Sequence, residues 1–451
     1  MGICLRASEV ALVRRGWRVI AAACAAGLFW SGPAALAVPQ AGPDPGSPAS
    51  PGSPGTSGGL PGPLPGCPPQ HGIAAPAGRP WAQRVLRFSS VWHLTRGGGV
   101  TVAVVDSGVD ANPQFGRRVI TGPDLAAADP AGATARYPRN ADCVGHGTSM
   151  ASIIAAAPVA GVSFTGVAPA ARILSIKISS SDTFPTAVTP QAIRDAVKLG
   201  ASVINLSLAT TDDVPALRSA VDFALRSNVV VVAAAGNDAS QAGGGQGGNT
   251  AGASGPFYPA AYPGVLSVGA VGPDGALASF SDRRTPVSVT APGVDVTSAY
   301  PGVFPRAYEP AQNGTSFAAA FVSGVAALVR SCYPRLDEAQ VVARIEATAR
   351  GPAGPGTGHG LVNPVRAVTA ALPPARFAGG ASPGPASANA SASAASGGQN
   401  GHARHTAPAR AAPSGPSART VALAVIAGSF GLMIVVVTAV RVLPAARRRR
   451  L

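Results

Sequence analysis

Five short apolar runs, rich in β-branched residues, are spaced along the middle of the 451-residue chain, at 99–106, 171–178, 201–208, 228–236 and 264–271. Runs of this length without polar alternation predict strands that are buried on both faces of a parallel sheet. Helical patterns lie between and after them, at 189–199, 214–226, 315–330 and 337–348. Strands that alternate with helices predict an α/β domain, in which a mostly parallel sheet lies between two layers of helices.

The flanks of this domain have a different composition. Glycine and proline are dense in two stretches, a Pro/Gly-rich N-terminal extension at 38–80 and a linker at 373–419. Neither stretch carries enough apolar surface to offset the entropy of ordering, so we predict no packed core in them. The globular domain is therefore expected at 81–372.

The two ends of the chain predict export and membrane anchoring. Three arginines, an apolar stretch at 19–30 and small residues at 35–37 predict a signal peptide at 1–37, with an uncleaved anchor helix as the alternative. Residues 421–440 carry no charge and would span about 30 Å as a helix. We expect a transmembrane helix at 420–443, although a buried core helix has a similar pattern.

Charge sets the expected topology. The basic tail at 444–451 would stay in the cytoplasm, which places the domain outside the cell membrane on a single-pass anchor. The net charge of +15 owes much to basic clusters at the two ends, so it indicates membrane topology and not a nucleic-acid partner. We see no aspartate-rich loop with calcium spacing and expect neither a metal nor a cofactor.

Cysteine usage suits an oxidising compartment. Cys67, Cys143 and Cys332 remain after the expected signal peptide is removed, and three thiols allow three pairings. We favour Cys67 with Cys143, because each lies in a loop flanked by proline or glycine. That pairing leaves Cys332, which follows an apolar helix, outside the bridge.

Four polar residues stand where parallel-sheet proteins carry chemistry. Asp106 ends an apolar strand, and Asn237 follows another. His146 lies between two glycines before a helix of small residues, and Ser316 lies in the first turn of the helix predicted from residue 315. Each has a plain structural alternative: a turn aspartate, a turn asparagine, a structural histidine or a helix cap.

Taken together, the four residues predict hydrolytic chemistry. Asp, His and Ser occur in one of the chain orders known for hydrolytic triads. The acid would orient the imidazole, the imidazole would take the serine proton, and the serine would attack a carbonyl. Asn237 and the backbone N–H of Ser316 would hold the oxyanion.

Four stretches, "VAVVDSGVD", "GHGTSMAS", "AAGN" and "NGTSFAAAFVSG", resemble the signature motifs of the subtilisin-like serine proteases. The resemblance covers about residues 99–368. It implies a subtilisin-like three-layer α/β fold, the triad Asp106, His146 and Ser316, and Asn237 as oxyanion donor. The stretch "NLSL" resembles the strand that pairs with extended substrate, which implies that Ser207 and Leu208 bind substrate.

The flanking architecture is similar to that of mycosins, the membrane-bound subtilases of actinobacterial type VII secretion systems. The similarity rests on "PWAQRVL" at 80–86, the Pro-rich extension with its cysteine, the linker and the C-terminal anchor. It implies an extension that wraps the protease domain, and the Cys67–Cys143 pairing is similar to a family bridge. A Gly-rich loop at 238–256 departs from the family pattern.

The resemblance implies a serine endopeptidase that acts on protein substrates beside a type VII secretion membrane complex. The alternative is a mainly structural component of that complex, with proteolysis secondary. A degradative surface protease without a partner complex is a further reading.

Overall fold

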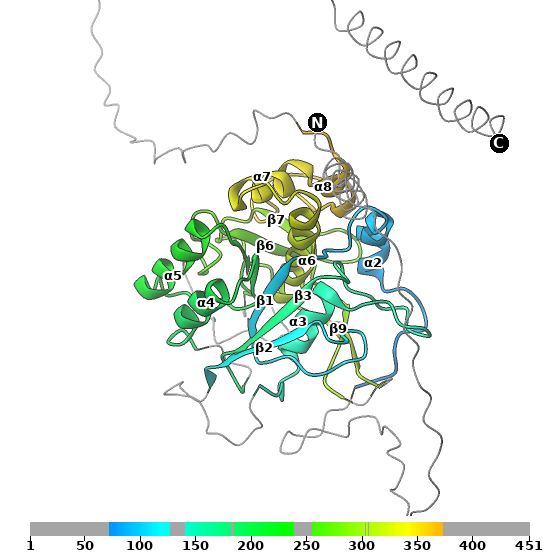
Figure 1. Ribbon diagram of the computed structural model, residues 1–451. Helices are drawn as coiled ribbons and strands as arrows, with labels where there is room; N and C mark the ends of the chain where they lie inside the picture. Colours follow the sequence, from blue (N-terminus) through cyan, green and yellow to red (C-terminus); the bar gives the residue numbers. More distant parts are fainter. Residues whose placement is uncertain are drawn as a thin grey trace, which may run out of the picture. The chain divides into compact units, whose positions relative to one another are not determined.

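Strands and helices alternate along the part of the chain that the computed structural model describes, which is residues 72–126, 140–181, 185–238, 255–302, 304 and 306–372 (Figure 1). The strands are β1 (Thr101–Asp106), β2 (Val119–Asp124), β3 (Arg172–Lys177), β4 (Val203–Leu206), β5 (Val230–Ala234), β6 (Leu266–Val271), β7 (Val289–Pro292), β8 (Val296–Ala299) and β9 (Tyr308–Gln312). The helices are α2 (Trp81–Leu86), the 3-10 turn η1 (Phe88–Val91), α3 (His146–Ala155), α4 (Thr189–Lys198), α5 (Pro215–Arg226), α6 (Thr315–Cys332), α7 (Glu338–Thr348) and α8 (Pro364–Thr369).

Seven of these strands form one sheet in the order β2-β3-β1-β4-β5-β6-β7, and every neighbouring pair is parallel. Strands β8 and β9 form a separate antiparallel pair. Because the seven strands run the same way, the residues that follow β1, β4 and β5 collect at one edge of the sheet. That edge holds Asp106, Ser207 and Asn237.

Side-chain alternation along the strands divides the core into two layers. In β1, Val102 and Val104 face a cluster with α3, α6, α7 and α8, whereas Ala103 and Val105 face α4 and α5. Figure 1 shows α4 and α5 (green) on one side of the sheet and α3 and α6 on the other. Because alternate residues of each strand are buried on opposite faces of the sheet, these strands appear in the sequence as continuous apolar runs. The predicted α/β fold with a parallel sheet is confirmed.

Helix α6 is the central helix of one layer. It packs on β4, β5, β6 and β7 as well as on α3, and nearly all of its 18 residues are buried. Among the described residues, α6 is the one helix that is long and apolar enough to cross a membrane. Because it is buried inside the domain, it is a core helix. The predicted signal peptide, linker, membrane helix and basic tail lie outside the described residues.

Several elements carry no strong sequence signal. Strand β2 reads "VITGPD", is half-exposed at the edge of the sheet and lacks an apolar run. Strand β7 is only four residues long and ends in proline. The described end of the N-terminal extension also contacts the domain, since Ile73 pairs with Tyr308 of β9.

Candidate active site

Asp106 and His146 meet at the carboxyl edge of the sheet. Asp106 is the last residue of β1 and His146 the first of α3, and both are buried. Nδ1 of His146 lies 2.8 Å and 3.0 Å from the two carboxylate oxygens of Asp106. Because a carboxylate only accepts hydrogen bonds, Nδ1 carries the proton in this contact and Nε2 is left as an acceptor.

The two glycines beside His146 allow this approach. Gly145 has a φ of +93°, and a Cβ there would lie 2.0 Å from the ring of Tyr300. A Cβ on Gly147 would lie 2.0 Å from the carbonyl oxygen of Gly108. The glycines therefore let the start of α3 sit directly on the turn after β1, which brings the imidazole to Asp106.

Ser316 lies in the first turn of α6, beside the same edge. The ring of Phe317, the next residue, packs edge-on against the imidazole of His146 with centroids 6.0 Å apart. The Ser316 hydroxyl donates to the carbonyl oxygen of Ser207 at 3.2 Å. Its backbone N–H belongs to the first helical turn, where no intrahelical acceptor exists.

Asn237 is fixed beside the start of α6. Its Oδ1 accepts from the backbone N–H and from the hydroxyl of Thr315, each at 3.0 Å. The amide is thereby oriented, with Nδ2 on the side of Gly314, where an added Cβ would lie 3.6 Å from it. The side-chain amide of Asn237 and the backbone N–H of Ser316 therefore both lie at the start of α6.

The predicted substrate residues Ser207 and Leu208 follow β4, and their side chains are buried. The Ser207 hydroxyl donates to the Ser316 carbonyl at 3.0 Å and accepts from Asn205 at 2.9 Å. Leu208 packs in the core layer with α4 and α5. A contact of these two residues with substrate would therefore use their backbone.

A buried charged cluster that the motifs do not indicate lies next to His146. Asp110, Asp142 and Lys177 are all buried, and the Lys177 ammonium donates to the Ala141 carbonyl. Burial, with a smaller contribution from the Asp142 charge, raises the pKa of Asp110 to about 7. Burial also raises the pKa of Asp142 and lowers the pKa of Lys177. Asp110 lies four residues after Asp106 and Asp142 four residues before His146, where aspartates look like turn residues in sequence.

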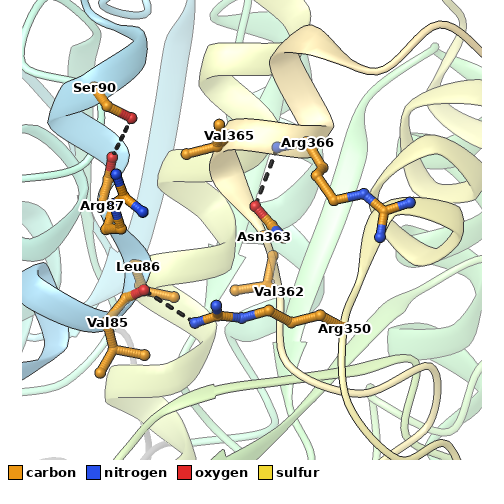
Figure 2. A pocket seen from close by; sticks show the side chains of 9 residues that line it. All are labelled: Val85, Leu86, Arg87, Ser90, Arg350, Val362, Asn363, Val365 and Arg366. Atoms are coloured by element: carbon orange, nitrogen blue, oxygen red, sulfur yellow. Dashed lines mark hydrogen bonds between the residues drawn. The ribbon is translucent and has the colours of Figure 1, made fainter.

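A separate pocket lies between α2, η1 and α8, with an empty volume of about 530 Å³ that includes its open mouth (Figure 2). Arg87, Arg350 and Arg366 are among its lining residues, and none of the predicted site residues is. All three arginines are exposed, so solvent satisfies their charges. Among the described residues no group of three or more His, Cys, Asp or Glu could hold a metal ion.

Comparison with known proteins identifies the family. The model of the subtilase family, Peptidase S8, matches residues 97–375, more than half of the chain. The chain belongs to the subtilase family. It is a subtilisin-like serine protease, as its motifs predict.

Several relatives of this subtilase are mycosins. Mycosin-1 of Mycobacterium tuberculosis is 37% identical over 65% of this chain and 74% of its own length. Mycosin-3 of the same organism is 33% identical over 82% of this chain and 89% of its own length. The crystal structure of MycP1 from the ESX-1 type VII secretion system superposes with a TM-score of 0.56 at 31% identity, covering 69% of this chain and 92% of that chain.

The described part of this subtilase holds two cysteines, Cys143 and Cys332, and both are buried. The expectation that Cys332 stays outside the bridge remains a prediction. Cys67 lies outside the described part, and its pairing with Cys143 stays a prediction.

Proposed function

We propose that this subtilase is a membrane-anchored extracytoplasmic serine endopeptidase with the triad Asp106, His146 and Ser316. The observation that carries the proposal is the buried contact of His146 with Asp106, with the hydroxyl of Ser316 at the adjacent helix start. No other described histidine is in contact with a buried carboxylate.

The proposed reaction begins with a rotation of the Ser316 side chain. Its hydroxyl leaves the Ser207 carbonyl and turns to Nε2 of His146. Catalytic hydrogen bonds commonly form or shorten in this way when substrate binds. His146 takes the proton as Oγ attacks the scissile carbonyl, and Asp106 stabilises the resulting imidazolium.

Asn237 and the Ser316 N–H then stabilise the oxyanion of the tetrahedral intermediate. His146 passes its proton to the leaving amine, which releases the first product and leaves an acyl group on Ser316. A water molecule, activated in turn by His146, hydrolyses this ester. An extended substrate would lie along the backbone of Ser207 and Leu208 during both steps.

Proteolysis is tested with the full chain purified in detergent. We expect the wild type to cleave a denatured protein such as casein, and Ser316→Ala to lose activity by about 10⁶-fold. Thermal unfolding of both proteins controls for folding. Equal cleavage by the two proteins would refute the assignment of Ser316.

We further propose that the protein is a mycosin that works beside a type VII secretion membrane complex. The support is its similarity to Mycosin-1 and Mycosin-3 and to MycP1. A membrane helix at 420–443 would anchor it, and the linker would let the domain reach about 40 Å from that anchor. Membrane fractionation with protease accessibility tests this topology. A wild-type domain that an added protease digests only from the cytoplasmic side would contradict it.

The same Ser316→Ala variant distinguishes the proteolytic role from the alternative, a mainly structural role in the complex. Secretion and substrate cleavage are measured in one strain. Loss of cleavage with intact secretion would assign the secretion role to the folded domain alone.

Mapping disulfides in the unreduced protein would test the proposed Cys67–Cys143 bridge, which predicts one peptide pair that contains both residues.

A further inference from the structure

Asp142 is a completely buried carboxylate that receives hydrogen bonds at both oxygens. Its Oδ1 accepts from the Gly145 N–H at 2.7 Å and from the Ser107 hydroxyl at 2.8 Å. Its Oδ2 accepts from the Thr148 N–H at 2.7 Å and from the Thr148 hydroxyl at 2.6 Å. Burial raises the pKa of this carboxyl, and the surrounding donors oppose that rise.

These bonds replace a cap that α3 cannot make for itself. The N-cap residue of α3 is Gly145, which has no side chain to accept from the first turn. Its φ of +93° and the Tyr300 ring, 2.0 Å from an added Cβ, exclude Ser, Thr or Asp at this position. Helix starts need acceptors for their free N–H groups. Asp142 supplies one from three residues upstream and holds the turn that begins with His146.

Asp142 reaches the acid of the proposed triad through a second route. The Ser107 hydroxyl, bonded to Asp142, also lies 3.2 Å from Oδ1 of Asp106. The same hydroxyl oxygen accepts from the N–H of Gly147 at 3.0 Å. One carboxylate therefore ties together the residues that follow His146 and the residue that follows Asp106.

We propose that Asp142 is the positioning residue that sets the imidazole of His146 against Asp106 and towards Ser316. This role rests on the proposed function, because it matters only if His146 is the base. Asp142 acts through the turn and through Ser107, and it touches neither substrate nor the reacting atoms.

Replacement by asparagine discriminates this role from simple filling of space. Each oxygen of Asp142 faces a backbone N–H, from Gly145 on one side and from Thr148 on the other. An Asn side chain would direct its NH₂ at one of these donors in either orientation. Asp142→Asn is therefore expected to be no milder than Asp142→Ala, although it keeps the size and shape of the aspartate.

The experiment measures labelling of the detergent-purified full chain by a fluorophosphonate, with the maximal rate and the reagent concentration at half-maximal rate determined separately. We expect Asp142→Asn to lower the maximal rate by about 10- to 100-fold, the loss that a misplacement of about 1 Å causes. The half-maximal concentration stays unchanged, because the binding surface is intact. Asp212→Asn, at an exposed aspartate, is the matched control and keeps both parameters.

Ser107→Ala provides a second variant in case Asp142→Asn does not fold. It removes the Ser107 bonds and keeps the three backbone N–H bonds that Asp142 accepts from Val144, Gly145 and Thr148, so we expect an intermediate loss of maximal rate. A wild-type maximal rate in folded Asp142→Asn, or in Ser107→Ala if the first variant is unfolded, overturns the positioning role alone. A wild type that is not labelled at Ser316 overturns the proposed function and this role with it.

Discussion

Gly147→Ala tests the geometry of the site without touching any proposed catalytic group. Gly147 follows His146 in the first turn of α3, where the helix rests on the turn after β1. An alanine Cβ would lie 2.0 Å from the Gly108 carbonyl oxygen and 3.2 Å from Cβ of Asp106. Since Cβ contacts below 3.0 Å essentially do not occur, the helix start or the turn must move by about 1 Å.

A movement of that size would lengthen the 2.8 Å bond between His146 and Asp106 beyond hydrogen-bonding range. We expect the rate of peptide hydrolysis to fall by about 100-fold. Overpacking should cost about 1–3 kcal/mol of stability, offset by up to ~1 kcal/mol from the better helix propensity of alanine.

The assay compares the full chain in detergent with Gly147→Ala and with Gly98→Ala, in peptide hydrolysis and in thermal unfolding. Gly98 is exposed, and its added Cβ would meet only Ala170 at 3.9 Å, so this control should behave as wild type. If Gly147→Ala kept both wild-type activity and the wild-type unfolding midpoint, the close seating of α3 on the turn after β1 would be refuted.

Two further predictions address other parts of the site. Asn237→Ala should lower kcat for peptide hydrolysis by about 10²- to 10³-fold with little change in KM, because it removes a donor that acts on the oxyanion; an unchanged kcat would exclude Asn237 from that role. Asp110→Asn tests the charged cluster: with the Asp110 pKa raised to about 7 from an ordinary 3.8, the folded protein keeps a proton that the unfolded chain loses. The free energy of unfolding should therefore fall as pH rises from about 4 to about 7, and less so in Asp110→Asn. Parallel pH profiles of the unfolding midpoint for the two proteins would contradict this.

The sequence predicted the buried half of this fold better than its edges. Strands β1, β3, β4, β5 and β6 lie inside the predicted apolar runs, because burial on both faces demands uninterrupted Val, Ile, Leu and Ala. The edge strand β2 and the β8–β9 pair depend on contacts distant in the chain, such as the pairing of Ile73 with Tyr308. Such contacts leave no local periodicity.

The same distinction holds at the site. The sequence predicts Asp106, His146, Asn237 and Ser316 as site residues because each stands at or close to the end of a strand or the start of a helix. Asp142 was missed, because its importance comes from donors contributed by Ser107 and Thr148, far apart in the chain. The sequence does not show that Asp142 caps α3, because this depends on Gly145 being the N-cap residue with a positive φ, which only the structure reveals.

Mapping of a fluorophosphonate adduct by peptide mass spectrometry tests the role of Ser316 as nucleophile most directly. On the folded full chain, we expect one modified residue, Ser316, with no adduct after heat denaturation and none in Ser316→Ala. An adduct on a different serine, or equal labelling of Ser316→Ala, would contradict it.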